Sequence, residues 1–470
     1  MNESANPCDS PGGSAAAPLT ATGRLIMLTV AFLGWLFAGV LMSITTIAMQ
    51  PAVVDLLGRT GQLDRGQYLE LSRKSQAGKS ASGGSGLSAA DQELLAGWKA
   101  KSTRWVAWMT CAFLFGAAAG GLIFGAVGDG FGRARGMGFS ILTYSLFSAA
   151  AWFSDSPWML CLCWFLACLG VGGMWPNGVA LVSEAWASLS RPMAAGIIGT
   201  AANVGIFLMS TLATKVAVTS SDWRWVMLVA AAPVVLGIFS LLTVPESPQW
   251  LASRRKAQTA SAGSSRRGEI FRAPFLRVTL VGIGLATIPI IGGWGSANWM
   301  VPWAAEAGDT ADPPNPTLKA TVSQTRAITG IVGSFLGGWI ASALGRRLTF
   351  FLASFGSLVT AQYAFWFLYP GNGEFLWWVA ALGLFNGVYF GWLPLCLPEL
   401  FPTRVRAAGS GVSFNFGRIL SAVTVFASGT LTQFFEGDYA RIGRATSLIF
   451  LIGMVLIAFA PDTSGRRLDE

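Results

Sequence analysis

The chain has 470 residues, of which 53% are hydrophobic and only 12% are charged, and it contains 57 Gly, 20 Trp and no His. A charged share about half that of soluble globular proteins excludes a soluble enzyme, a disordered scaffold and a disulfide-stapled secreted domain. The hydrophobic residues suffice for about 12 membrane spans of about 20 residues each. The net charge of +9 therefore bears on orientation in a membrane, and we expect no nucleic-acid partner.

Apolar runs in chain order predict an all-α membrane protein with twelve transmembrane helices. The predicted spans are 25–49, 104–127, 137–154, 157–184, 193–217, 224–244, 277–303, 322–343, 348–369, 374–398, 407–432 and 442–460. Residues 1–23 form a polar tail that we expect to be disordered. An external insertion at 58–103 contains Ser88-Ala-Ala-Asp91, a pattern similar to a capping box that predicts a short helix.

A basic linker at 245–276 divides the spans into an N-terminal bundle (24–244) and a C-terminal bundle (277–461), followed by a tail at 462–470. An even number of spans places both termini on one side. With both termini in the cytoplasm, the inside loops hold most of the basic residues of the short loops. The short outside loops then hold Lys215, Arg224, Lys319, Arg326, Arg441 and Arg444. We expect a protein integral to the plasma (inner) membrane, with lipid around it.

Neither a metal site nor a cofactor is predicted. The chain has no His and no Cys-x-x-Cys pair, and Cys161 and Cys163 stand two residues apart, on different sides of a helix. Without such ligands or acids in mid-membrane, we expect no enzyme activity.

The two bundles repeat one motif after equivalent spans. Gly125-x3-Asp129-x2-Gly132-Arg133-Ala134-Arg135 follows span two, and Gly338-x3-Ser342-x2-Gly345-Arg346-Arg347 follows span eight. Because each bundle has six spans, the repeats share one orientation in the membrane. We expect Gly132 and Gly345 to turn the chain at the cytoplasmic surface. Three motifs, Gly116-x3-Gly120, Gly121-x3-Gly125 and Gly333-x3-Gly337, should let neighbouring helices approach closely.

A second repeated spacing involves glutamates at the cytoplasmic ends of spans. Glu184 stands seven residues before Arg191, and Glu399 stands seven before Arg406. We expect these glutamates to form charge networks with Arg133 and Arg346 that hold the bundles shut on one side and break as they rock.

The repeated Gly-x3-Asp-x2-Gly-Arg pattern resembles the loop signature of the major facilitator superfamily. Trp223-Arg224-Trp225, Pro245-Glu246-Ser247-Pro248-Gln249-Trp250-Leu251 and Pro398-Glu399-Leu400-Phe401-Pro402-Thr403-Arg404-Val405-Arg406 look like segments of its sugar-porter and metabolite:H⁺ symporter branches. Gly417-Arg418-Ile419 is similar to an element of its aromatic-acid and organic-anion members. The resemblance covers 24–461 and implies a monomeric carrier that moves a small-molecule solute by alternating access.

Two positions depart from this family pattern. Ser342 stands where the second motif often has Asp, which predicts a weaker charge relay there. Span one contains Gly34-Trp35-Leu36-Phe37-Ala38-Gly39-Val40-Leu41, which resembles a Gly-Trp-x-x-Asp-Gly-x-Asp motif of proton-coupled relatives but lacks both carboxylates. We therefore expect uptake to depend weakly on a pH gradient.

Arg418 is the leading candidate for a substrate ligand because it lies about 18 Å past Arg406 along span eleven, near the bilayer midplane. A guanidinium there could hold a substrate carboxylate, or it could bond helix carbonyls and brace spans ten and eleven. Weaker candidates are polar or aromatic groups at depth. They are Asn415, Asn386, Tyr389, Asn298, Trp294, Asn203, Asn177, Trp175 and Gln50. Pro289 with Gly292-Gly293 makes span seven the expected bending helix.

The sequence thus predicts a secondary transporter, with an organic anion such as a carboxylate metabolite as the favoured solute. A neutral sugar or polyol is the alternative, favoured by the Pro-Glu-Ser-Pro segment. A non-transporting sensor on the same fold is a third interpretation, indicated by the long external insertion and the missing carboxylates.

Overall fold

The computed structural model describes residues 19–82, 87–185, 191–248, 250–252, 254, 269–311, 313–401, 405–434 and 438–463. The tail expected at 462–470 and the disordered tail expected at 1–23 therefore lie largely outside the described residues, as does most of the linker expected at 245–276. Residues 19–23 are described, and Thr20 caps the first helix by accepting a hydrogen bond from the Gly23 amide at 3.0 Å.

The N-terminal half contains helices α1 to α9. They are α1 (Ala21–Ile47), α2 (Met49–Arg59), α3 (Arg65–Ser82), α4 (Ala89–Phe131), α5 (Arg133–Ala151), α6 (Pro157–Ala185), α7 (Arg191–Lys215), α8 (Trp225–Ala231) and α9 (Val234–Thr243). The six spans of this half are α1, α4, α5, α6, α7, and α8 with α9, the last two being separated at Pro233; α2 follows α1 beyond the first span.

The C-terminal half follows the short turn η1 (Glu269–Phe271). Its elements are α11 (Leu276–Ile291), η2 (Gly292–Ser296), η3 (Ala297–Trp299), α12 (Met300–Thr310), α13 (Leu318–Ala343), α14 (Arg346–Phe367), α15 (Gly373–Glu399), α16 (Arg406–Phe434), α17 (Tyr439–Ser447), α18 (Ile449–Leu456) and η4 (Ile457–Phe459). The six spans here are α11 to α12, α13, α14, α15, α16, and α17 with α18. The fold is therefore the expected two bundles of six spans.

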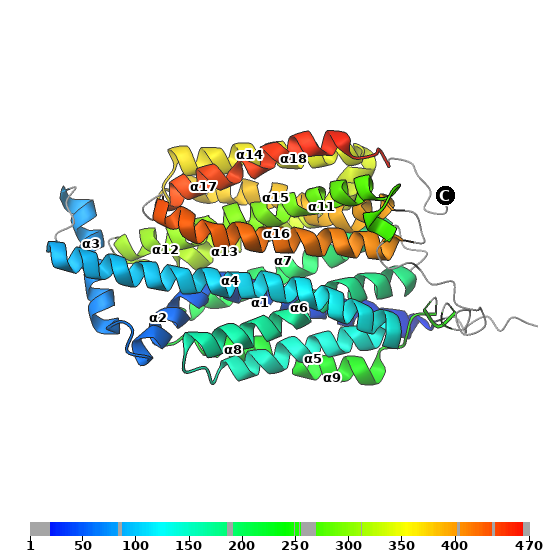
Figure 1. The fold of residues 1–470 in the computed structure, drawn as a ribbon, viewed down its shortest axis with the longest axis horizontal. Helices are drawn as coiled ribbons and strands as arrows, with labels where there is room; N and C mark the ends of the chain where they lie inside the picture. Colours follow the sequence, from blue (N-terminus) through cyan, green and yellow to red (C-terminus); the bar gives the residue numbers. More distant parts are fainter. Residues whose placement is uncertain are drawn as a thin grey trace, which may run out of the picture.

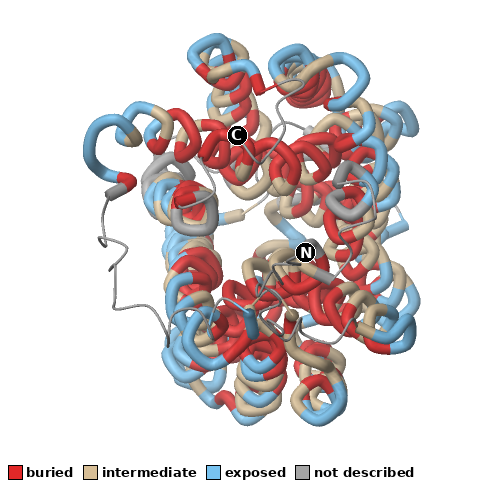
Figure 2. Tube along the Cα trace, turned by 90° about the vertical axis from the view of Figure 1, so that its right-hand side faces the viewer, coloured by how far each residue is buried: buried red, intermediate tan, exposed pale blue. Residues whose placement is uncertain are grey.

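The outer surface of both bundles is apolar. Nine helical segments of the described chain are long and apolar enough to cross a membrane, and α5, α13 and α16 add helices of 19, 26 and 29 residues. Exposed stretches lie around the periphery and buried ones between the helices (Figure 2). Large apolar side chains are exposed there, among them Leu242 and Trp377 at 78%. Such a surface is stable in hydrocarbon and costly in water.

The two halves lie side by side with their helices running along the long axis of the molecule (Figure 1). One end, where α1 begins and η4 ends, is called here the terminal end. The opposite end, where α3 and the start of α4 project, is called the insertion end. The halves meet mainly where α7 packs on α13 and α15, and where α4 packs on α16.

The insertion is more ordered than a polar loop. α3 is a helix of 18 residues, and Ser88 caps the next helix by accepting from the Asp91 amide at 3.1 Å. The predicted capping box is thus confirmed. The helix it begins is not short, because α4 continues without a break for 43 residues through span two.

Close helix packing in both halves depends on glycine. A Cβ added at Gly120 would lie 1.8 Å from the Leu169 carbonyl oxygen, and one at Gly333 would lie 2.1 Å from that of Leu384. The expected close approach is present at Gly116-x3-Gly120 and Gly333-x3-Gly337, but it is wrong for Gly125, whose Cβ would meet no atom within 4 Å. Gly132 (φ 121°) and Gly345 (φ 88°) make the turns into α5 and α14, in a region that favours glycine.

Span seven bends where the sequence predicts it. α11 ends after Pro289, the chain makes a π-helical turn over Gly292–Ser296 and a 3-10 turn over Ala297–Trp299, and α12 completes the span. Such a break places side chains and backbone of this span at a central cavity.

Candidate functional site

A central pocket with an empty volume of about 850 Å³, open solvent included, lies between the two halves. Both halves line it, through α1, α6 and α7 on one side and η2, η3, α13 and α15 on the other. The lining residues are Trp35, Met42, Ser43, Thr46, Trp175, Gly199, Ala202, Asn203, Ile206, Gly293, Trp294, Asn298, Arg326, Ala327, Gly330, Gly383, Asn386, Gly387 and Phe390.

Five of the predicted substrate-binding residues meet at this pocket. Trp175, Asn203, Trp294, Asn298 and Asn386 all line it, although they come from five separate elements. Small residues in the lining make space for the pocket. Gly293 follows the bend of span seven, and Gly330, Gly383 and Gly387 lie where α13 and α15 pack.

Arg326 is the charged group of the lining, and the sequence analysis missed it. The sequence analysis assigned Arg326 to an outside loop, although it lies inside predicted span eight. In the structure, α13 begins at Leu318, four residues before the predicted start of that span. The extra turn puts Arg326 about two turns deep. Its position within a predicted apolar span was the signal that could have identified it.

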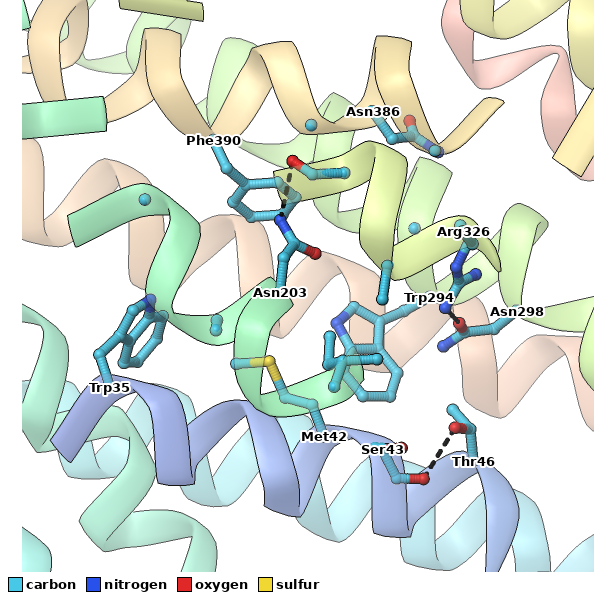
Figure 3. Close-up of a pocket in the computed structure, with 18 of the residues that line it drawn as sticks. Trp35, Met42, Ser43, Thr46, Asn203, Trp294, Asn298, Arg326, Asn386 and Phe390 are labelled. Atoms are coloured by element: carbon cyan, nitrogen blue, oxygen red, sulfur yellow. Dashed lines mark hydrogen bonds between the residues drawn. The ribbon is translucent and has the colours of Figure 1, made fainter. Parts of the chain in front are cut away.

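The Arg326 guanidinium has one partner and one free donor. Its Nη2 donates to Asn298 Oδ1 at 2.6 Å, and the two side chains face each other beside Trp294 (Figure 3). Its Nη1 is buried and has no hydrogen-bond partner among the described residues. A buried unpartnered donor on a cation favours an anionic ligand.

Aromatic rings form other walls of the pocket. Trp35 and Trp175 contact each other with ring centroids 4.8 Å apart, and Trp294 packs on Phe113 at 4.5 Å. Along α1, the Thr46 hydroxyl lies about 16 Å of helix rise beyond Trp35, toward the insertion end. The pocket is therefore cationic toward the insertion end, at Arg326, and aromatic toward the terminal end.

Arg418 does not line this pocket. It is 5% exposed, its Nη1 donates to the Ala117 carbonyl at 3.1 Å, and its guanidinium lies 4.7 Å over the Phe414 ring. The structure thus places it in the bracing arrangement, with one correction: it braces α16 against α4, not spans ten and eleven. Asn415 beside it is 5% exposed, and its side chain packs on Gly121.

Three further predicted binding residues also lie away from the pocket. Tyr389 is fully buried and pairs with Ser354 Oγ at 2.7 Å. Asn177 is fully buried and donates to the carbonyls of Phe124 and Gly173, both at 2.9 Å. Gln50 is exposed on α2. Buried polar groups in membrane proteins often join helices in this way, and sequence depth alone does not distinguish them from ligands.

Asn203 joins the two halves at the pocket, and further hydrogen bonds join them between the pocket and the insertion end. Asn203 Nδ2 donates to Ser334 Oγ at 2.9 Å, Ser210 Oγ to Ser323 Oγ at 2.9 Å, and Gln324 Nε2 to Thr211 Oγ1 at 2.9 Å. Lys319 also reaches the Val218 carbonyl at 3.3 Å. These contacts close the insertion side of the pocket.

The predicted charge networks at the terminal end exist, but each joins residues of one half. Asp129 pairs with Arg133 at 2.6 Å, and Arg346 makes a two-pronged contact with Glu399, its Nη2 at 3.0 Å and its Nε at 3.1 Å. Glu399 also accepts from Thr463 at 2.9 Å. The expectation that such networks hold the two bundles shut stays a prediction.

The Pro-Glu-Ser-Pro segment completes the N-terminal network. Glu246 accepts from the Arg133 amide at 2.9 Å, which caps the start of α5, and Ser247 Oγ donates to Glu184. Burial raises the pKa of Glu184 despite the Ser247 hydrogen bond and the nearby charge of Arg133, which lower it. The Glu246 carboxylate also interacts favourably with the N-terminus of α5, so it holds the segment after α9 against α5.

The remaining predicted gating residues have simpler positions. Arg347 donates its Nε to the Ala460 carbonyl at 2.9 Å, Arg135 is exposed, and Gly125 has open space around it. Gly338 is buried on α13. The side chains of Arg191 and Arg406 lie outside the described residues.

Asp55 is the centre of an ion cluster outside the spans that the sequence analysis did not predict. It is 4% exposed and contacts Arg59 at 3.1 Å, Arg65 at 3.3 Å and Arg224 at 2.9 Å, while Trp223 Nε1 donates to it at 3.0 Å. Burial alone would raise the pKa of Asp55, but these hydrogen bonds and charges lower it below its ordinary value.

Comparison with known proteins places this architecture in a family. The family model of the Major Facilitator Superfamily matches residues 95–425, and the chain belongs to that family. The fold is similar to that of the proton:xylose symporter XylE bound to 6-bromo-6-deoxy-D-glucose, with a TM-score of 0.64 and 14% identity over 96% of this chain and 99% of that one.

Two curated relatives indicate the class of cargo. The chain is 27% identical to the cis,cis-muconate transport protein of Acinetobacter baylyi over 68% of this chain and 76% of that protein. It is 24% identical to the putative niacin/nicotinamide transporter NiaP of Bacillus subtilis over 75% of this chain and 84% of that protein. The chain is a membrane transporter for a small organic solute.

Proposed function

We propose that the central pocket binds a small organic anion, with the substrate carboxylate on Arg326 and the substrate body against Trp294, Trp35 and Trp175. The observation that carries the proposal is the Arg326 guanidinium, which lines the pocket with a buried Nη1 that has no acceptor among the described residues. A charge-assisted hydrogen bond from such a donor is worth about 1.5–3 kcal/mol. The relatives named for muconate and niacin support the same class of solute.

Transport proceeds in this proposal by rocking of the two halves, 24–244 and 277–461, about the pocket. The contacts that join the halves toward the insertion end support a state closed on that side. With the insertion end outside the cell, the termini are cytoplasmic in the plasma (inner) membrane, as the basic loops predict. The carrier works as a monomer and performs no chemistry on its solute.

The test is initial uptake into proteoliposomes of nicotinate, cis,cis-muconate, sialic acid and xylose. We expect uptake of at least one carboxylate, and we expect Arg326→Gln to raise its KM about 10-fold to 100-fold, as loss of about 1.5–3 kcal/mol implies. Arg418→Gln is the matched control, because it removes a second intramembrane arginine that lies away from the pocket.

Four results would contradict the proposal. Unchanged carboxylate uptake by Arg326→Gln would remove Arg326 from the site, and a KM increase confined to Arg418→Gln would restore Arg418 as the substrate ligand. Uptake of xylose without any carboxylate would favour the sugar or polyol alternative. Absence of uptake for the whole panel, with specific binding retained, would favour the sensor alternative.

A further inference from the structure

The charge balance of the pocket differs between its empty and occupied states. Arg326 carries one positive charge, and the other described residues that line the pocket are uncharged. An organic monoanion seated on Arg326 would therefore make the occupied pocket neutral. The following inference rests on the proposed function, because it requires that an anion binds at this arginine.

The groups around Arg326 leave its charge uncompensated when the pocket is empty. Asn298 satisfies Nη2 through its Oδ1. The amide of Asn203 is already engaged with Gly330 and Ser334 on α13, and Asn386 accepts from Ser357 at 3.4 Å. None of these partners is an anion, so water or a ligand has to complete the solvation of the guanidinium.

Alternating access passes through a state in which the pocket is closed on both sides. In the empty carrier, that state removes water from a cation that has an unpartnered donor, which is costly in a low-dielectric interior. In the loaded carrier, the carboxylate replaces that water and cancels the charge. The loaded form therefore crosses the occluded state faster than the empty form.

We infer that this protein works as an anion exchanger: it returns across the membrane chiefly when it carries an organic anion, and net one-way transport is slow. No bond is made or broken in the cycle. One organic monoanion enters as another leaves, so the exchange moves no net charge.

The experiment compares uptake of labelled nicotinate, or of whichever carboxylate the panel identifies, into two sets of proteoliposomes. One set is loaded with the unlabelled carboxylate and the other with potassium chloride alone. We expect initial uptake to be at least about tenfold faster into the loaded vesicles, which corresponds to about 1.4 kcal/mol between the barriers of the empty and loaded forms. Loading with the neutral amide isostere, nicotinamide for nicotinate, should give no such stimulation.

Variants then assign the effect to the charge in the pocket. Arg326→Gln removes the charge, so the ratio of loaded to unloaded rates should fall toward one. The amide should then compete with the carboxylate better than it does in the unaltered protein. Arg326→Lys keeps the charge and should keep the stimulation, and Arg418→Gln should keep it as well.

The outcomes separate the two proposals. If none of the carboxylates is taken up, the proposed function fails and the exchange mechanism with it. If a carboxylate is taken up at equal rates into loaded and unloaded vesicles, the exchange mechanism is overturned while the anion pocket stands. The wild-type ratio decides this by itself, so the test survives a variant that fails to fold. Stimulation retained in Arg326→Gln would overturn the assignment to that arginine.

Discussion

Arg326 and Arg418 both lie deep within spans of this transporter, but the groups around them differ. Arg418 has a backbone carbonyl at 3.1 Å and an aromatic face at 4.7 Å, so its charge is satisfied by the protein. Arg326 has one amide oxygen and a buried donor without a partner in the described chain. An intramembrane cation that the protein leaves incompletely solvated is the better candidate for a ligand than one that it solvates fully.

Single glycines decide how closely helices of the same half approach. We expect Gly120→Ala to reduce the yield of monodisperse protein strongly, because its Cβ would lie 1.8 Å from the Leu169 carbonyl oxygen and α4 would have to move away from α6. Gly125→Ala on the same helix has no atom within 4 Å of its Cβ and should behave like the unaltered protein. Size-exclusion profiles after detergent extraction measure this, and equal profiles for both variants would contradict the packing argument.

At the scale of elements, the Asp55 cluster ties α2 to α3 and to the Trp223-Arg224 segment before α8. Arg224 extends the tie, because it also donates to the carbonyls of Trp152 at 3.1 Å and Ser154 at 2.8 Å. One carboxylate thus connects the loops at the insertion end of the N-terminal half. Arg224, which the sequence analysis assigned to a short outside loop, is thus a structural partner of Asp55.

The lowered pKa of Asp55 predicts a pH-dependent stability. A carboxyl group whose pKa is depressed in the folded state contributes stability above its unfolded pKa of about 3.9, and this is lost as pH falls below that value. We expect the Tm of detergent-solubilised protein to fall on acidification below about pH 4, and Asp55→Asn to lower Tm at pH 7 and flatten the acid dependence. Removing these charge-assisted hydrogen bonds should cost on the order of 1–3 kcal/mol.

Exposed Glu93 on α4 provides the control for that measurement. Glu93→Gln should leave both the Tm at pH 7 and its acid dependence close to those of the unaltered protein. If Asp55→Asn gives the same profile as Glu93→Gln, the cluster contributes no measurable stability and the argument from its lowered pKa is wrong.

At the scale of the whole molecule, the positions of the carboxylates bear on energy coupling. The described lining of the pocket contains no acid, and Asp55, a peripheral acid that could carry a proton, is held ionised by its arginines. Glu184 has a raised pKa, but it lies at the terminal end in contact with Ser247, away from the pocket.

We therefore expect an imposed pH gradient to change the initial uptake of an organic anion by less than about twofold at constant internal pH. A tenfold change in rate would require about 1.4 kcal/mol of coupling to the gradient, and no acid in the described lining of the pocket supplies it. Uptake into proteoliposomes with and without an inward proton gradient measures it. A carrier that accumulates its solute strongly when the gradient is applied, and loses this with a protonophore, would contradict the expectation.

The fold could be predicted from the sequence because its signals are local. Apolar runs of span length, the Gly-Asp-Gly-Arg motif in each half, and the Pro289-Gly292-Gly293 break depend on neighbours in the chain, and the structure has helices and turns at these places. The insertion was harder, since α3 is polar along its length and becomes a helix in contact with the rest of the protein. The length of α4 was also not predicted, because the helix that begins at Ala89 continues without a break into span two.

Only some of the site residues could be predicted from the sequence. Polar residues at depth in a span are visible in the sequence, and five of those named meet at the pocket. Whether each faces a cavity or another helix depends on helix rotation about its axis, which tertiary packing sets; Asn203 and Asn177 look alike in the sequence and differ in this respect. Arg326 was missed because it lies close to the start of predicted span eight (322–343) and was assigned to the loop before it, whereas α13 begins at Leu318.

By itself, the sequence determined that this chain is a membrane protein of two repeated six-span halves, because hydrophobicity and local turn chemistry act residue by residue. The tertiary structure decided which arginine faces the solute and which one braces helices, because that choice depends on how α13 and α16 are rotated against α7 and α4. It also decided contacts at the terminal end, where Arg346 meets Glu399 and Glu246 meets the start of α5, because these depend on the distance between helices. The charged residues can be counted in the sequence, whereas the groups that neutralise or solvate each of them depend on tertiary packing.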